Sequence, residues 1–363
     1  MYIITNREIK KGARGLKLFG KKPNVEGPNE LRLLSVTKTA RSWQVKEVAD
    51  RLGKATVTAL KKKFQLDIDT SQPWFGSLKV ACDLFERARK EKKSILFFVH
   101  GYNNDVEDVL LAAHAIEQLY NVIVVPFTWP ANGGGKLSGA AAYLSDKADA
   151  RTSANALNRA VGKIQYYHQL LTAKRTLALR QRADKIYPDN RQQANAWFTS
   201  LLDKDCQVRI SLLCHSMGNY VFKNTLKTGD NVTSHLVFDN ICLVAADTNN
   251  KDHAQWVGKL DVRKRVYVVI NEEDFALKFS RIKPGDEQRV RLGHYTRKLN
   301  SPNACYIDVT DASHVGKEHT YFKGDAVNKN AELKALFDGM FNGQAIEDEL
   351  AYHADKNIYV LEG

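Results

Sequence analysis

The chain has 363 residues, 44% of them hydrophobic and 26% charged, and its basic side chains outnumber the acidic ones by 13. These proportions are typical of a soluble globular protein. They exclude a membrane-spanning segment, because unbroken apolar runs such as 95–99 and 122–125 are far shorter than the roughly 18 residues that a span needs.

Cysteine usage and the N-terminus indicate the compartment. The N-terminal residues lack the apolar core and the cleavage site of a secretory signal. Five cysteines, at positions 82, 206, 214, 242 and 305, are scattered without a C-x-x-C pair, which favours reduced thiols and a cytoplasmic protein. No His-Glu-x-x-His motif or cysteine cluster is present in the sequence, so we expect neither a metal nor a cofactor.

The positive charge is concentrated near the N-terminus. Residues 1–64 hold 16 basic and 5 acidic side chains, a net charge of +11. Such a region can attract an anionic partner, for example nucleic acid, anionic lipid or an acidic protein. The alternative is a solvated face that only keeps the protein soluble, and it is favoured because no recognised nucleic-acid module accompanies the charge.

The apolar pattern along the chain predicts an α/β fold. Residues 2–5 and a segment within 31–48 are expected to pair at a sheet edge. Strands are predicted at 94–99, 121–127, 207–214, 240–247, 265–271 and 304–311, with helices at 106–120 and 217–226. This alternation is typical of a mostly parallel sheet covered by helices.

The long insertion between two of these strands is predicted to be helical. It runs over residues 138–203, follows a flexible glycine loop at 133–135, and is interrupted at 187–190. We expect it to form a helical cap that helps to select substrate, although it could equally be a helix pair that only packs on the sheet. The expected organisation is an N-terminal basic extension (1–90), a main domain (91–345) and a C-terminal tail (346–363).

A single Ser-x-Gly stands where a strand meets a helix. The segment Cys214-His215-Ser216-Met217-Gly218 has the context of a nucleophile elbow, a tight turn that pushes a serine out of the sheet. The turn needs small residues on both sides of the serine. Gly218 meets that need, and Cys214 stands where glycine is usual. The alternative is a serine that only caps the helix.

Two backbone amides are placed to stabilise an oxyanion. The amide of Met217 lies at the start of the predicted helix, where the helix dipole favours negative charge. The second amide is expected from the loop His100-Gly101-Tyr102-Asn103-Asn104 after strand 94–99, with Tyr102 the best candidate. His100 is expected to shape this loop through hydrogen bonds, and Trp129 to line the same region.

A serine nucleophile needs a base, and the base needs an orienting acid. In this architecture both follow the serine, on loops at the carboxyl ends of later strands. Asp274 follows strand 265–271, with Asp247 as the rival acid. The alternative for Asp274 is an acid in the first turn of a helix that only complements the helix dipole. His314 and His319 follow strand 304–311.

These motifs together resemble the α/β-hydrolase superfamily and, more narrowly, a bacterial α/β-hydrolase family of unknown function. The resemblance rests on Val99-His100-Gly101, on His215-Ser216-Met217-Gly218-Asn219 and on an N-terminal Thr5-Asn6-Arg7. It also rests on a segment containing Trp129-Pro130, Gly135, Tyr143, Asp146, Ala150 and Ser153, on the acid loop 271–277 and on His319-Thr320-Tyr321-Phe322. It covers roughly residues 90–325 and favours His319 over His314 as the base.

The resemblance implies an α/β-hydrolase fold and a serine hydrolase. Ser216, His319 and Asp274 would form the catalytic triad, and a small-molecule or lipid-like acyl substrate would be cleaved. An ester is a better candidate than a thioester or an amide, because ester leaving groups need less protonation. The alternative is a non-enzymatic protein that keeps the scaffold and docks an anionic partner through its basic N-terminal region. The sequence leaves the oligomeric state open.

Overall fold

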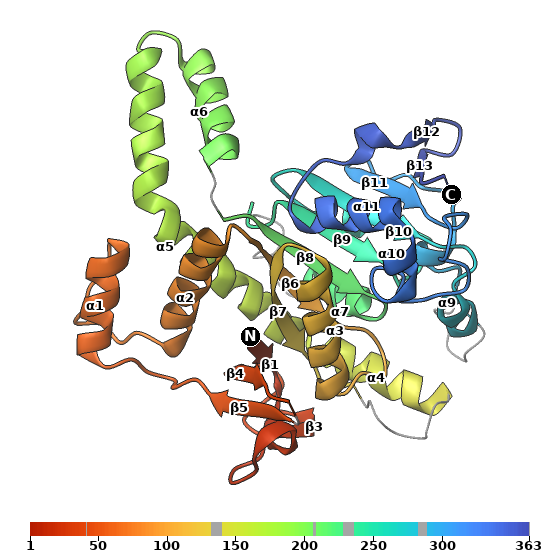
Figure 1. The fold of residues 1–363 in the computed structure, drawn as a ribbon, viewed down its shortest axis with the longest axis horizontal. Coiled ribbons are helices and arrows are strands. Elements are labelled where there is room, and N and C mark those ends of the chain that lie inside the picture. Colours follow the sequence, from red (N-terminus) through yellow and green to blue (C-terminus); the bar gives the residue numbers. More distant parts are fainter. Residues whose placement is uncertain (41, 132–139, 206–207, 228–235, 282–288, 363) are drawn as a thin grey trace.

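A computed structural model describes residues 1–40, 42–131, 140–205, 208–227, 236–281 and 289–362 (Figure 1). The glycine loop expected at 133–135 lies outside these residues. One sheet of 11 strands forms the centre, in the order β12-β13-β11-β10-β9-β8-β6-β7-β1-β4-β5, and every pairing from β13 to β1 is parallel. The predicted mostly parallel sheet is therefore confirmed.

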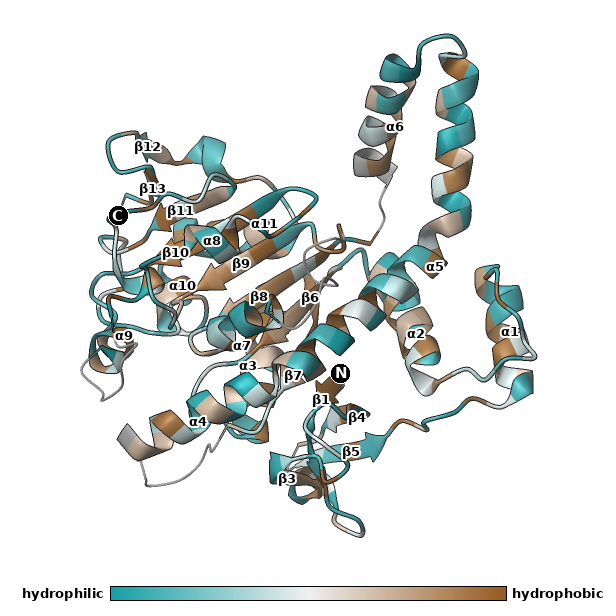
Figure 2. Ribbon diagram, turned by 180° about the vertical axis from the view of Figure 1, so that it is seen from behind, coloured by the Kyte–Doolittle hydropathy of each residue, from teal (hydrophilic) through white to brown (hydrophobic). Residues whose placement is uncertain are grey.

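The central strands lie close to their predicted positions. They are β6 (Ser94–Val99), β7 (Val122–Thr128), β8 (Ile210–His215), β9 (Asn240–Val244), β10 (Arg265–Ile270) and β11 (Ala304–Asp308). The side chains of β6 to β9 are all buried, as expected for parallel strands covered on both faces. Figure 2 shows this concentration of hydrophobic residues in the central strands.

Helices cover both faces of the sheet (Figures 1 and 2). Side chains alternate between the faces along each strand. Phe97 therefore packs with α2 (Gly76–Glu91), α5 (Ala154–Ile186) and α7 (Gly218–Thr225), whereas Leu96 packs with α3 (Val106–Leu119) and α11 (Ala331–Phe341). The short helices α8 (Ala254–Val257) and α10 (Asp325–Lys329) pack on the first and second of these faces respectively.

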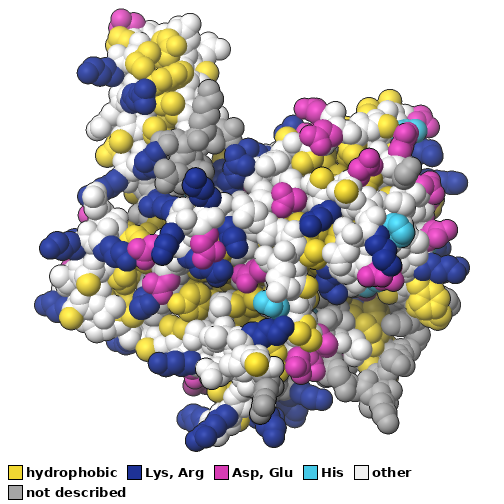
Figure 3. Space-filling model, in the orientation of Figure 1, with side chains coloured by type: hydrophobic (Ala, Val, Ile, Leu, Met, Phe, Trp, Pro, Cys, Tyr) yellow, Lys and Arg dark blue, Asp and Glu magenta, His cyan; other side chains and the backbone are white. Residues whose placement is uncertain are grey.

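The N-terminal residues form one edge of the sheet. Strand β1 (Tyr2–Thr5) lies parallel to β7 and antiparallel to β4 (Arg32–Lys38), and β5 (Trp43–Glu47) is the last strand. A separate two-stranded sheet joins β2 (Arg7–Ile9) to β3 (Phe19–Pro23). The helix α1 (Lys54–Phe64) packs beside α2, and Figure 3 shows many Lys and Arg side chains over this N-terminal region. The basic region is therefore built into the fold through β1.

The C-terminal residues form the opposite edge. We expected a tail from residue 346, but β12 (Ala351–His353) and β13 (Ile358–Val360) extend the sheet. These residues join the sheet because β13 pairs in parallel with β11 and because the side chain of Ile358, in β13, is buried. These strands have only three residues each, too short for a clear alternating pattern in the sequence.

The long insertion differs from the expected cap. It contains α4 (Ala140–Thr152), α5 and α6 (Arg191–Asp205), with the predicted break between α5 and α6. The distal part of α5 and α6 form an antiparallel hairpin that projects from the body (Figure 1). Because α6 ends just before β8 begins, the hairpin stands at the amino end of β8, whereas Ser216 follows its carboxyl end. The hairpin therefore does not cover Ser216.

The hairpin is held mainly by contacts within itself. Arg180 donates to Asn195 Oδ1 at 2.6 Å, and the rings of Tyr187 and Trp197 lie edge to face. Of the described residues in 172–205, none belongs to the hydrophobic clusters of the core. Even α5, with 33 residues, lacks an apolar stretch that could cross a membrane, as do the other described helices.

We predict that this hairpin can be removed without unfolding the body. Replacing residues 176–200 with a short Gly-Ser-Asn-Gly turn should leave the melting temperature of the protein within about 4 °C of the intact chain, the shift that about 1 kcal/mol produces in a domain of some 200 residues. Calorimetry of both proteins checks this. A loss of cooperative unfolding in the shortened chain would contradict it.

Candidate active site

Ser216 occupies a strained turn between β8 and α7. Its backbone φ is 52°, a left-handed conformation that is uncommon for residues other than glycine. Neighbouring backbone holds the turn: the Ser216 amide donates to Val244 O at 3.1 Å, and the Asn219 side chain donates to Cys214 O at 2.9 Å. The side chain of Cys214 is fully buried. A small apolar residue therefore fills the position where glycine is usual.

Two glycines allow the surrounding backbone to approach this turn. A Cβ on Gly218 would lie 2.4 Å from Val99 O and 2.7 Å from His100 O. A Cβ on Gly101 would lie 2.7 Å from Ser216 Cβ and 3.2 Å from its Oγ. The His-Gly loop after β6 and the serine after β8 are therefore in direct contact, and a side chain at either glycine would separate them.

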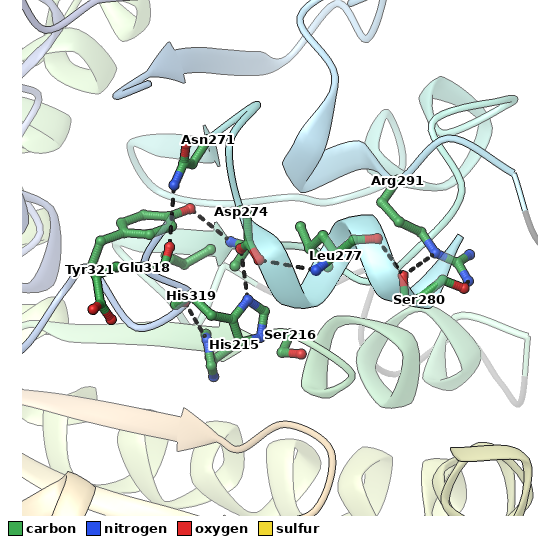
Figure 4. Close-up of polar contacts among 12 residues, drawn as sticks. His215, Ser216, Asn271, Asp274, Leu277, Ser280, Arg291, Glu318, His319 and Tyr321 are labelled. Atoms are coloured by element: carbon green, nitrogen blue, oxygen red, sulfur yellow. Dashed lines mark hydrogen bonds and ion pairs between the residues drawn. The ribbon is translucent and has the colours of Figure 1, made fainter. Parts of the chain in front are cut away.

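His319 and Asp274 are hydrogen-bonded to each other beside Ser216. His319 Nδ1 lies 2.6 Å from Asp274 Oδ2, and the carboxylate is fully buried. Figure 4 shows the imidazole between Asp274 and Ser216, with its second ring nitrogen on the Ser216 side. In the described part of the chain no hydrogen bond joins Ser216 Oγ to this ring. Such contacts often tighten only when substrate binds.

Asp274 has two structural roles. Its Oδ2 holds His319, while its Oδ1 accepts from the Leu277 amide at 3.0 Å and caps α9 (Phe275–Ser280). The expected alternative was an acid in the first turn of the helix; Asp274 is instead the N-cap residue, and this role coexists with the contact to His319. Each carboxylate oxygen has its own partner, so the cap fixes the orientation of the acid.

The loop that carries His319 is anchored from β10. Asn271 donates to Gly316 O at 2.9 Å and to Glu318 O at 3.2 Å (Figure 4). The buried Tyr321 hydroxyl accepts from the Ala245 amide at 3.1 Å and donates to Val269 O at 3.2 Å. These contacts fix the backbone on both sides of His319.

His100 shapes its loop and is held as a neutral ring. Its Nδ1 donates to Gly101 O at 2.9 Å, its Nε2 accepts from the Trp129 amide at 3.2 Å, and its ring stacks on Trp129. Burial, reinforced by Arg7, lowers the pKa of His100 to about 3. Both ring nitrogens of His100 therefore make hydrogen bonds that hold the local backbone.

The N-terminal Thr5-Asn6-Arg7 segment lies at the end of β1 and stabilises the loop after β6. The buried Arg7 side chain donates to Thr128 Oγ1 at 3.1 Å, to Asn104 O at 3.2 Å and to Ala131 O at 3.3 Å. Burial lowers the pKa of Arg7 to about 10, and Asp105 and Asp146 oppose that shift. A guanidinium with this pKa remains charged at neutral pH.

Asp146 connects α4 to the same loop. Its Oδ2 accepts from the Asn103 amide at 3.1 Å, and Asn103 has a φ of 56°. The Tyr102 ring lies edge to face against Tyr143 of α4 at 5.6 Å. The backbone on both sides of the expected oxyanion donor is therefore held by α4, the first part of the insertion.

Asp247, the rival acid, is used elsewhere. Its carboxylate forms a buried ion pair with Arg291 at 2.9 Å and accepts from the Tyr143 hydroxyl at 2.9 Å. The Asp247 amide donates to Ser216 O at 3.2 Å, so this residue supports the serine turn through its backbone. The rival His314 is exposed, in a left-handed backbone conformation.

A cavity of about 370 Å³ opens at Ser216. Its walls include Gly101, Tyr102, Phe322 and His319. Described residues of the insertion do not line it. Lys323 and Asp108 also line the cavity, so it contains charge of both signs; burial lowers the pKa of Lys323, while Glu318 and Asp108 raise it. The described residues include no group of three or more potential metal-ligating side chains.

The fold and this site define an α/β-hydrolase scaffold. The family model described as "Alpha/beta hydrolase of unknown function (DUF900)" matches residues 80–172 and 184–333, and the chain belongs to this family. The interruption at 173–183 falls in the distal part of α5, within the projecting hairpin. Searches among curated proteins and among solved structures gave no match.

The structure brings together most of the residues that the sequence singled out. One group lies around Ser216: His100, Gly101, Tyr102, Asn103, Trp129, Met217, Asp274 and His319. Sequence reasoning did not assign roles to Asn271, Arg291 or Lys323. Asn271 stood within the acid loop and could have been found there. Arg291 had no signal, because its partner Asp247 is 44 positions away.

We predict opposite stability changes for two helical glycines. Gly218→Ala should lower the free energy of unfolding by about 1–3 kcal/mol, because its Cβ would meet backbone oxygens that cannot move aside easily. Gly162→Ala in α5 should raise it by about 0.5–1 kcal/mol, because its Cβ would enter open space. Urea unfolding measures both values, and equal changes would contradict the close approach at Gly218.

We also predict that buried histidines make the fold acid-sensitive. Burial lowers the pKa of His100 and of His168 to about 3, and that of His215 well below its usual value. Because the folded-state pKa values are depressed, this stability is complete above about pH 6.5 and declines as the pH falls towards 3. His168→Gln should reduce the slope of unfolding free energy against pH by up to about 1.4 kcal/mol per pH unit below pH 6. The exposed His314→Gln is the control, and an unchanged slope in the His168 variant would contradict the prediction.

Proposed function

We propose that the protein is a serine hydrolase that cleaves a carboxylic ester. The observation that carries this proposal is the 2.6 Å contact between His319 Nδ1 and Asp274 Oδ2, beside a serine at a positive φ. A carboxylate on Nδ1 keeps that nitrogen protonated, so Nε2 is left to accept the proton of Ser216. A serine that only capped a helix or packed in the core would need neither His319 nor Asp274 beside it.

The proposed reaction has two steps. Ser216 Oγ attacks the ester carbonyl while His319 takes the serine proton, and the amides of Tyr102 and Met217 donate to the oxyanion. His319 then gives the proton to the leaving alkoxide, and the alcohol departs from an acyl-enzyme. Water, deprotonated by His319, attacks the acyl carbon and releases the carboxylic acid, so that Ser216 recovers its proton.

The cavity supports a small acyl substrate. Its volume of about 370 Å³ lies near the lower end of the range of about 300–1,000 Å³ for ligand pockets. Phe98, Leu111 and Phe322 provide apolar walls, and Lys323 provides a cation. An ester is favoured over a thioester or an amide because its leaving group needs little protonation. The place of action that we propose is the cytoplasm, since the four described cysteines are free thiols.

Labelling with a fluorophosphonate and hydrolysis of short p-nitrophenyl esters test the proposal. Ser216→Ala should abolish labelling, and Asp274→Asn should lower kcat by about 10³–10⁴-fold, because the imidazole loses its orientation and charge partner. His314→Ala is the matched control for the base. His314→Ala should keep the activity of the intact chain.

A different result would favour the alternative function. An intact chain that neither reacts with the probe nor hydrolyses any short ester would contradict the hydrolase proposal. Salt-dependent binding of that chain to nucleic acid or anionic vesicles would then support a docking protein that uses its basic N-terminal region.

A further inference from the structure

A second and larger cavity lies between the sheet and the helices α2 and α5. Its volume is about 640 Å³, and it shares no lining residue with the cavity at Ser216. Apolar side chains of the sheet form its floor: Ile4, Ile95, Phe97, Val125 and Ile210. Its walls come from α2, from the first half of α5 and from residues 31–33 and 48–50. This volume falls within the range of about 300–1,000 Å³ that small-molecule sites occupy.

Gly162 leaves part of this space open. It lies inside α5, where glycine is unfavourable relative to alanine. A Cβ at Gly162 would meet no atom within 4 Å, in contrast to Gly76 at the start of α2, whose Cβ would lie 2.2 Å from Ala49 O. The packing of the fold therefore does not require glycine at position 162. The missing side chain instead enlarges the cavity that Gly162 lines.

A buried amide also faces this cavity. Asn158 is only 8% exposed, and its Oδ1 has no hydrogen-bond partner in the described part of the chain. Asn158 lies one turn before Gly162 in α5, and both residues line the cavity. Because an unpaired buried acceptor is unfavourable, it indicates a position where a water held in the cavity with the ligand donates a hydrogen bond; an ionised carboxylate has no donor of its own.

The charges at the cavity are mainly positive. The charged lining residues are Arg32, Asp50, Arg159 and Lys163. Arg32 is paired with Glu26, and Arg159 lies 3.1 Å from Glu30. Lys163 stands over the rings of Phe75 and Tyr166, at 5.6 Å and 5.9 Å from their centroids, and no described carboxylate lies within ion-pair distance of it. Lys163 is therefore the cation available to an anionic ligand.

We propose that this cavity binds a long-chain carboxylate, with its alkyl chain on the apolar floor and its carboxylate at Lys163. The floor excludes a ligand that is polar along its length, because polar groups buried there would lack partners. Lys163 adds a charge-assisted contact that an uncharged ligand of the same length cannot make. The site is separate from Ser216 and does not depend on the proposed hydrolysis.

Titration of the full chain with a fluorescent long-chain fatty acid, below its micelle concentration, tests this proposal. The intact protein should bind one equivalent saturably. Gly162→Phe should weaken binding at least tenfold, because its ring would occupy the cavity. Gly162→Leu is a second variant for the case in which the phenylalanine variant does not fold, because leucine is a good helix former. Circular dichroism of each variant checks that it is folded.

Charge variants test where the carboxylate lies. Lys163→Gln should weaken fatty-acid binding at least tenfold and leave binding of the fatty alcohol of the same length unchanged. Lys174→Gln, an exposed lysine further along α5, is the matched control and should bind as the intact chain does. Ser216→Ala should also bind the fatty acid normally, which separates this site from the one proposed for catalysis. Non-saturable binding to the intact chain, or unchanged binding by a folded Gly162 variant, would overturn the proposal.

Discussion

The close approach of two glycines to neighbouring backbone sets the geometry on which the proposed site depends. Gly218 allows α7 to start against the carbonyls that end β6, and Gly101 allows the next loop to touch Ser216. Because β6 and β8 are adjacent parallel strands, the serine and the expected oxyanion loop emerge side by side. The left-handed conformation of Ser216 can persist because the backbone around it is held by hydrogen bonds on several sides.

The residues around this turn share their supports. Asp247 holds the serine turn through its amide and binds Arg291 through its carboxylate. Asp274 caps α9 and fixes His319. Arg7 reaches from the edge of the sheet to the loop after β6. The N-terminal strands, α4 and the later loops are thus coupled to one turn, so the basic N-terminal region is structurally part of the scaffold as well as a source of positive charge.

The two cavities use different parts of the same sheet. The cavity at Ser216 lies where the parallel strands end, the place where α/β proteins commonly bind ligands because loops converge there. The larger cavity lies under α2 and α5, on the face of the sheet that carries Phe97. The projecting hairpin covers neither Ser216 nor the core, and the family match is interrupted within it. The family match includes α6 and omits only residues 173–183 of α5, so most of the hairpin belongs to the matched scaffold.

The sequence by itself determined the alternation of strands and helices, because periodicity and turn residues are local signals. It also placed Ser216, Asp274 and His319 at strand ends, where side chains distant in the sequence meet. The tertiary structure decided what depends on long-range partners. Asp247 forms an ion pair with Arg291, whereas Asp274 contacts His319. The short strand β13 is held in the sheet by its pairing with β11. The direction of the hairpin could not be predicted from the sequence. The distal part of α5 contacts α6, and apolar residues nearer its start pack with α1 and α2, but an apolar pattern does not show which element it will pack against.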